Sequence, residues 1–314
     1  MHRWTATTWK SLCSIPDEQE LMQHLIPRDA LRYDFLMDAI LAVAALETAH
    51  ELGVEAAPKY GLAALEYYDH SLRAFHAELG KGITEENYLA AFICSLMLGI
   101  VSTHAPKYSP DGADGSGRSA LETAFLVFDM MEGNRSVVLT SWKWIVKGPL
   151  KLDAWEPVGP LHLLNDETKA AMARLRSLND QAYPASGPGD PAEGPAAIFS
   201  TDPHAAYQSA IKYLEDIYAR EAGGKVKAAC IAYPGLAGPY FSAAIRRPEP
   251  MALLILMHWG VLMHRLGRDT WWAAGQDLVA EITAVLRQSQ LSPSEELKET
   301  INWARTQADL PPLS

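Results

Sequence analysis

The residues best suited to chemistry include two histidines in the most apolar stretch of the chain. His258 and His264 lie within residues 251–264, a run dominated by Leu, Ile, Val and Met. In an α-helix, six positions separate two side chains by about 120° around the axis, so one helix face cannot direct both at a single metal ion. Each histidine is therefore predicted to act alone, as a hydrogen-bonded core residue or as an acid–base group.

The remaining candidates fall into two sets with different chemistry. If the protein is an enzyme, the polar side chains that could carry acid–base or electrostatic catalysis are His258, Asp269, Tyr240 and Lys143. The side chains predicted to line an apolar ligand pocket are Trp142, Trp144, Tyr233, Tyr240, His258, Trp259, Leu262, Trp271 and Trp272. Nine tryptophans and ten methionines favour an adaptable cavity, because methionine repacks easily and tryptophan offers a flat wall with one donor. Core packing is the alternative for each of them.

Motifs for metals, nucleotides and nucleophilic catalysis are missing. Residues 111–122 have the length of a calcium loop, but Ala113, Gly115 and Ser116 stand where two oxygen ligands and the turn glycine belong. His50-Glu51 lacks the second histidine of a zinc-peptidase helix. There is no nucleophile elbow, phosphate loop or dinucleotide fingerprint. The sequence therefore predicts no cofactor and no metal.

Composition restricts the class of protein. The 314 residues are 48% hydrophobic and 21% charged, which excludes an intrinsically disordered chain. With 27 basic and 38 acidic residues the net charge is −11, so direct binding of nucleic acid is not expected. The three cysteines lie far apart, which excludes a disulfide scaffold or a cysteine zinc cluster. With no signal peptide and no apolar run long enough to cross a membrane, we expect a cytoplasmic or nuclear protein.

The elements that must position these residues are almost all helices. We expect an all-α fold, a single large bundle-like domain over residues 1–314 with an apolar internal pocket. A flexible loop is expected at about 183–200 and another at 106–118, and residues 233–240 are read as a Pro/Gly-rich connection. Helices are predicted at 34–53, from 58, at 89–101, 119–131, 136–146, 168–178, 202–221 and 250–264, from 271, and around 303.

Several blocks, taken in order, resemble one known family. They are His2-Arg3-Trp4-Thr5-Ala6-Thr7, Phe35-Leu36-Met37-Asp38-Ala39-Ile40, Trp142-Lys143-Trp144 with Gly148-Pro149-Leu150, and residues 254–262 followed by Trp271-Trp272. They resemble the regulatory domain of fungal zinc-binuclear-cluster transcription factors of the sterol-uptake-control type. The resemblance implies an all-α domain that holds a lipid-like molecule between its C-terminal helices. It also implies a six-cysteine DNA-reading cluster ahead of the domain, and this chain is expected to lack one.

Three functions follow as hypotheses. The first is a regulatory domain that binds a hydrophobic small molecule of sterol, terpenoid or polyketide type, without a DNA-binding module of its own. The second is a stand-alone, metal-independent cyclase or isomerase of fungal secondary metabolism, which would need pocket shape and one or two polar groups. The third is a helical scaffold that forms a homodimer or pairs with a full-length relative.

Overall fold

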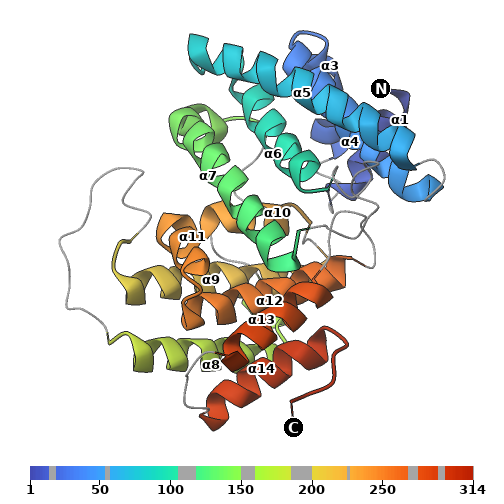
Figure 1. Cartoon of the computed structure of the whole chain (residues 1–314). Helices are drawn as coiled ribbons and strands as arrows, with labels where there is room; N and C mark the ends of the chain where they lie inside the picture. The colour runs from blue at the N-terminus through green and yellow to red at the C-terminus, as the bar shows by residue number, and fades with distance from the viewer. Residues whose placement is uncertain are drawn as a thin grey trace. The chain divides into compact units, whose positions relative to one another are not determined.

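The computed structural model describes residues 1–13, 19–53, 57–104, 118–149, 160–184, 200–224, 227–267, 275–288 and 294–313. These residues are helical with no strand, which confirms the predicted all-α class (Figure 1). The helices are α1 (His2–Ala6), η1 (Thr8–Ser11), η2 (Glu20–Leu25), α3 (Ile26–Ala30), α4 (Asp34–Leu52), α5 (Ala57–Lys81), α6 (Tyr88–His104), α7 (Ala120–Ile145), η6 (Leu161–Leu163), α8 (Asp166–Ala182), α9 (Pro203–Ala222), α10 (Lys227–Leu236), α11 (Gly238–Arg246), α12 (Pro250–Leu266), α13 (Gln276–Gln288) and α14 (Glu295–Gln307).

The chain divides into two compact units. Unit 1 comprises Met1–Ser119 and Asp129–Trp155, and unit 2 comprises Ala120–Phe128 and Glu156–Ser314. Unit 1 therefore contains α1 to α6 and most of α7. Unit 2 contains the first turns of α7 and all helices from η6 to α14. The predicted loops at 106–118 and 183–200 lie almost entirely outside the described residues.

Unit 1 is built around two helices that are apolar on nearly every side. α4 and α6 bury most of their residues, as their sequences predict, and α5 packs along α4 through a stripe that includes Ser71 and Phe75. The fully buried Ser71 hydroxyl donates to the carbonyl of Phe35 at 2.6 Å. α4 stops where predicted, because Gly53 adopts a φ of +72° that other residues rarely accept.

The N-terminal segment is an integral part of unit 1. Trp4 is fully buried, and its Nε1–H donates to the carbonyl of Met22 at 2.7 Å. The Thr8 hydroxyl donates to the buried carboxylate of Glu47 at 2.5 Å, and the Arg3 guanidinium lies 3.5 Å from the same carboxylate oxygen. These contacts fix α1 and η1 to α4, a role that local helix propensity alone does not predict.

α7 corrects one prediction. The sequence predicts two helices, at 119–131 and 136–146, whereas the structure has one helix that continues through Gly133. Glycine costs about 1 kcal/mol inside a helix, and packing exceeds that cost here. Met131 is 3% exposed, and the Asn134 side-chain amide donates to the Ser95 hydroxyl of α6 at 2.5 Å.

The region around residues 233–240 corrects a second prediction. Instead of an irregular connection, it forms the end of α10 and the start of α11, separated only at Ala237. Gly238 supplies the turn with a φ of +86°, and Pro239 follows in the first turn of α11, where a missing N–H has no cost. Burial of Tyr233 and Phe241, both fully inaccessible, holds the two helices in place.

Unit 2 is organised around α12, which packs against α8, α9, α10, α11, α13 and α14. α12 and the residue before α13 approach very closely: a Cβ on Gly275 would lie 1.8 Å from the Gly260 carbonyl oxygen. Along α14, the pairs His264–Asp309 and His258–Trp303 show that α12 and α14 run in parallel. Figure 1 shows α8, α9 and α12 to α14 as neighbouring layers.

Candidate functional site: the aromatic interior of unit 2

Four aromatic rings from four helices meet in unit 2. Phe128 of α7, Tyr233 of α10, Phe241 of α11 and Trp259 of α12 are 3% exposed or less. Phe128 contacts the other three rings at centroid distances of 5.6 to 6.4 Å, and Tyr233 stacks on Trp259 at 6.3 Å. Such edge-to-face and offset arrangements stabilise aromatic pairs beyond their area of burial. We call these four residues the aromatic cluster.

The polar atoms of the aromatic cluster make long hydrogen bonds. The Tyr233 hydroxyl donates to the Ala210 carbonyl at 3.4 Å, and Trp259 Nε1–H donates to the Cys230 carbonyl at 3.3 Å. Both exceed the usual 2.7–3.2 Å range, so they restrain the rings weakly. Burial raises the pKa of the Tyr233 phenol far above its ordinary value. The cluster therefore offers neutral rings and weakly engaged donors, with no charge.

His258 precedes Trp259 on α12 and is fully buried. Its Nδ1 lies 2.7 Å from the Leu254 carbonyl, so Nδ1 carries the proton and Nε2 is an acceptor in the neutral ring. The ring stacks on Trp303 with a centroid distance of 5.0 Å and an interplanar angle of 14°. Burial lowers the pKa of His258 to about 4; the Leu254 hydrogen bond opposes this shift and Arg174 adds to it. His258 is a neutral imidazole at physiological pH.

A second, polar cluster in unit 2 contains Tyr240. The buried Tyr207 hydroxyl donates to one carboxylate oxygen of Glu249 at 2.5 Å, and Arg247 Nε–H donates to the other at 2.9 Å. The Tyr183 and Tyr240 rings lie 5.2 and 5.6 Å from the Tyr207 ring. Burial, followed by the Glu249 charge, raises the pKa of Tyr240, so its phenol is a hydrogen-bond donor at neutral pH. We call these five residues the Glu249 cluster.

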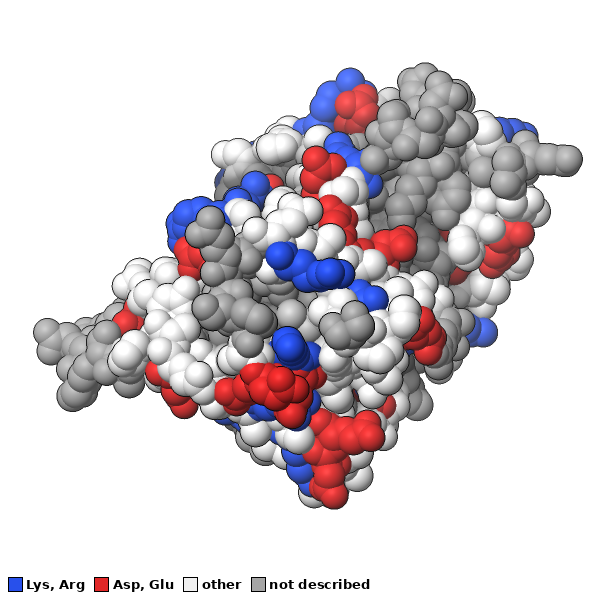
Figure 2. Space-filling view, turned by 60° about the horizontal axis from the view of Figure 1, so that its bottom comes forward, with Lys and Arg blue, Asp and Glu red and all other residues white. Residues whose placement is uncertain are grey.

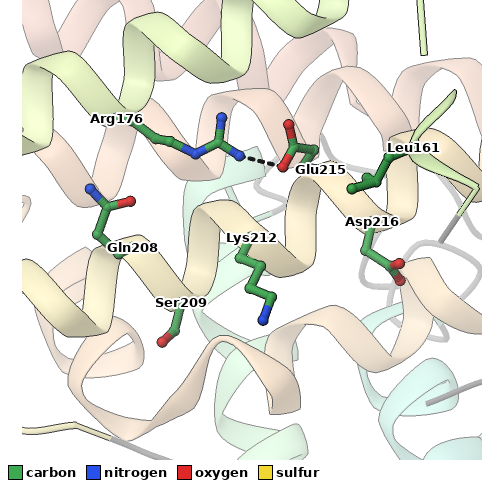
Figure 3. A pocket seen from close by; sticks show the side chains of 7 residues that line it. All are labelled: Leu161, Arg176, Gln208, Ser209, Lys212, Glu215 and Asp216. Carbon is green, nitrogen blue, oxygen red and sulfur yellow. Dashed lines mark hydrogen bonds and ion pairs between the residues drawn. The ribbon is translucent and has the colours of Figure 1, made fainter. Parts of the chain in front are cut away.

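An open cleft of about 420 Å³ lies along α9, away from the predicted pocket residues. Figure 3 shows the Arg176 guanidinium of α8 directed at the Glu215 carboxylate of α9, with Lys212 and Asp216 on neighbouring turns. Leu161, Gln208 and Ser209 complete its lining. Sequence reasoning did not single out these residues, because charges at helical spacing are typical of any solvated helix face. On the face in Figure 2, acidic and basic side chains are likewise interspersed.

Of the predicted pocket residues, Tyr233 and Trp259 are in contact and others lie in different parts of the fold. Tyr233, His258, Trp259 and Leu262 are all buried in unit 2, and Tyr240 belongs to the Glu249 cluster of the same unit. Trp142, Lys143 and Trp144 belong to the unit 1 part of α7, where Trp142 is 37% exposed and Lys143 Nζ lies 4.2 Å from the centre of the Trp144 ring. Asp269, Trp271 and Trp272 lie outside the described residues. Sequence reasoning missed Phe128, Phe241, Tyr207 and Glu249.

Two further features of the described residues bear on the site. They contain no cluster of three or more His, Cys, Asp or Glu side chains arranged to hold a metal ion. Within the same residues, every helix is too short or too polar to span a membrane.

Comparison with known proteins gives one informative similarity. The chain is 32% identical to a Zn(2)-C6 fungal-type transcription factor of Gibberella zeae in an alignment 153 positions long, which covers 46% of the chain. The matched stretch is 30% of that relative's length. No protein-family model matches the chain, and no solved structure is similar to it. Nearly half of this helical chain is thus similar to part of a fungal transcription factor.

Proposed function

We propose that the chain is a regulatory region of the kind carried by Zn(2)-C6 fungal-type transcription factors, and that unit 2 binds a hydrophobic small molecule at the aromatic cluster. The similarity to the Gibberella zeae protein and the all-α fold support the first part. The net charge of −11 favours a region that leaves DNA contacts to another part or another protein. Such a regulator acts in the nucleus, alone, as a homodimer or paired with a full-length relative.

The observation that carries the ligand proposal is the uncharged, weakly hydrogen-bonded aromatic interior of unit 2. The donors of Tyr233 and Trp259 sit at 3.3 to 3.4 Å from their acceptors, so a ligand can engage them at little cost. The buried methionines Met251, Met257 and Met263 on α12 add side chains that repack readily around a guest. A molecule that fits is neutral, largely apolar and able to stack on aromatic rings.

A binding experiment tests this proposal with farnesyl methyl ether, a neutral terpenoid without a hydroxyl donor. We expect calorimetric titration to detect binding to the wild-type protein and to show at least tenfold weaker binding to Trp259→Phe, which keeps the core filled but shrinks the stacking surface. Trp9→Phe in unit 1 is the matched control and should bind as the wild type does. Equal affinity of the two variants, or no heat of binding with the wild type, would contradict the proposal.

The Glu249 cluster favours a second candidate, a metal-independent cyclase or isomerase. A carboxylate that shares a 2.5 Å hydrogen bond with a phenol, beside further phenols, can accept and return a proton. Gene deletion followed by complementation with Glu249→Gln separates the two candidates. A catalyst changes the ratio of metabolites while transcripts of the biosynthetic genes stay constant, whereas a regulator changes the transcripts. Glu299→Gln, at an exposed position of α14, is the control.

A further inference from the structure

Three side chains with buried nitrogen atoms, Arg174, His258 and Trp303, lie on α8, α12 and α14, three helices that pack against one another. Gln181 of α8 bonds Glu296 of α14, and the two helices run in opposite directions (Figure 1). Seven residues back along α8 is Arg174, and seven residues forward along α14 is Trp303. Seven residues rise about 10.5 Å and return to nearly the same face, so Arg174 and Trp303 lie level and face each other's helix.

His258 completes the group from the third helix. Its ring stacks on Trp303 at a centroid distance of 5.0 Å, and Arg174 is close enough to oppose its protonation. The fully buried nitrogens Arg174 Nε, His258 Nε2 and Trp303 Nε1 have no hydrogen-bond partner among the residues that the structure describes. Two of them are donors, and His258 Nε2 is an acceptor because Nδ1 holds the ring proton.

Two described polar side chains near Trp303 and His258, Tyr218 and Arg265, bond to other partners. The Tyr218 hydroxyl donates to the His258 carbonyl at 2.7 Å. Arg265 donates to Glu221 and to Gln307 at 2.5 Å each. Each unpaired buried polar atom costs about 1–3 kcal/mol, and native proteins rarely leave several together without a partner such as water or a ligand.

We propose that Arg174, His258 and Trp303 form a binding site for a single hydroxyl oxygen, supplied by an ordered water or by the alcohol group of the hydrophobic ligand. A hydroxyl matches the three nitrogens, because its oxygen accepts from Arg174 Nε–H and Trp303 Nε1–H while its hydrogen is donated to His258 Nε2. The ligand form of this site rests on the proposed function, and it restricts that ligand to hydrophobic alcohols.

The first arm of the test measures the water form through stability. Trp303→Phe keeps the ring that stacks on His258 and removes the donor. Trp9→Phe removes an equally buried and unpartnered indole N–H from unit 1. We measure urea unfolding without ligand. The unfolding equilibrium constant of Trp303→Phe should be at least five times that of Trp9→Phe. Arg174→Met, which keeps the aliphatic stem, should show the same loss.

The second arm measures the ligand form by comparing farnesol with farnesyl methyl ether. If the ligand supplies the oxygen, the wild-type protein should bind farnesol at least tenfold more tightly than the ether. Trp303→Phe and Arg174→Met should then abolish this preference while their affinity for the ether stays at the wild-type value. Binding of the ether to the wild type reports on the proposed function alone. The site is refuted if both variants match Trp9→Phe in stability and also keep the wild-type ratio of alcohol to ether affinity.

Discussion

Acidification should destabilise the protein through His258, whose pKa burial lowers to about 4. In the unfolded chain a histidine titrates near 6.5. Between pH 6.5 and pH 4, His258 is therefore protonated in the unfolded state and neutral in the folded state, so stability falls as the pH falls. The loss begins near pH 6.5, stops below pH 4, and amounts to about 3 kcal/mol in total. Between pH 7.5 and pH 5 the same relation gives about 2 kcal/mol.

The variant His258→Phe isolates this effect, because it preserves the stack on Trp303 and removes the titrating group. We measure the free energy of unfolding in urea at pH 7.5 and at pH 5 by circular dichroism. Between these pH values it should fall by about 2 kcal/mol more for the wild type than for the variant. All other histidines are common to both proteins, so their contributions cancel in the difference. An equal decrease in the two proteins would show that His258 accepts a proton inside the fold.

Three further outcomes follow from contacts in the fold. Gly275→Ala would place its Cβ 1.8 Å from the backbone of α12 and should lower the free energy of unfolding in urea by about 3 kcal/mol or more. Gly80→Ala on α5 meets open space and should raise it by about 0.5–1 kcal/mol. Ser71→Ala removes a buried hydrogen bond to α4 and should cost about 1–2 kcal/mol; Thr140→Ala, an exposed hydroxyl bonded within its own helix, should change the stability by less than about 0.5 kcal/mol. The three buried thiols, among them Cys94 with its pKa raised to about 12 by burial, should resist iodoacetamide at pH 8 in the native protein and react after denaturation, as counted by mass spectrometry. Rapid native labelling would contradict the packing.

Strong periodicity and clear end signals made much of the helical framework predictable. α4 with its terminal glycine, and α6 after the Thr84–Asn87 turn, both lie close to where the sequence places them. Errors arose where tertiary packing outweighs local preference. Gly133 inside α7 and Pro234 inside α10 are residue types that predict helix ends, but buried neighbours keep both helices continuous.

The site was predictable only in part, for a related reason. The apolar character of residues 251–264 led directly to His258 and Trp259, because an all-round apolar helix must lie in the interior. Phe128 and Phe241 carry no signal that distinguishes them from other core aromatics, and they reach the cluster only through the tertiary packing. Glu249 precedes a proline after α11, a position typical of an exposed loop carboxylate. Its hydrogen bond with Tyr207 joins residues 42 positions apart, so the local sequence does not predict it.

The depth of the three cysteines has a practical consequence for site-directed spin labelling. Since the native thiols are shielded, a cysteine introduced at an exposed position in each unit can be spin-labelled without first removing Cys13, Cys94 or Cys230. Electron–electron distance measurements on such doubly labelled protein, with and without a terpenoid, would report directly whether occupation of one unit is communicated to the other.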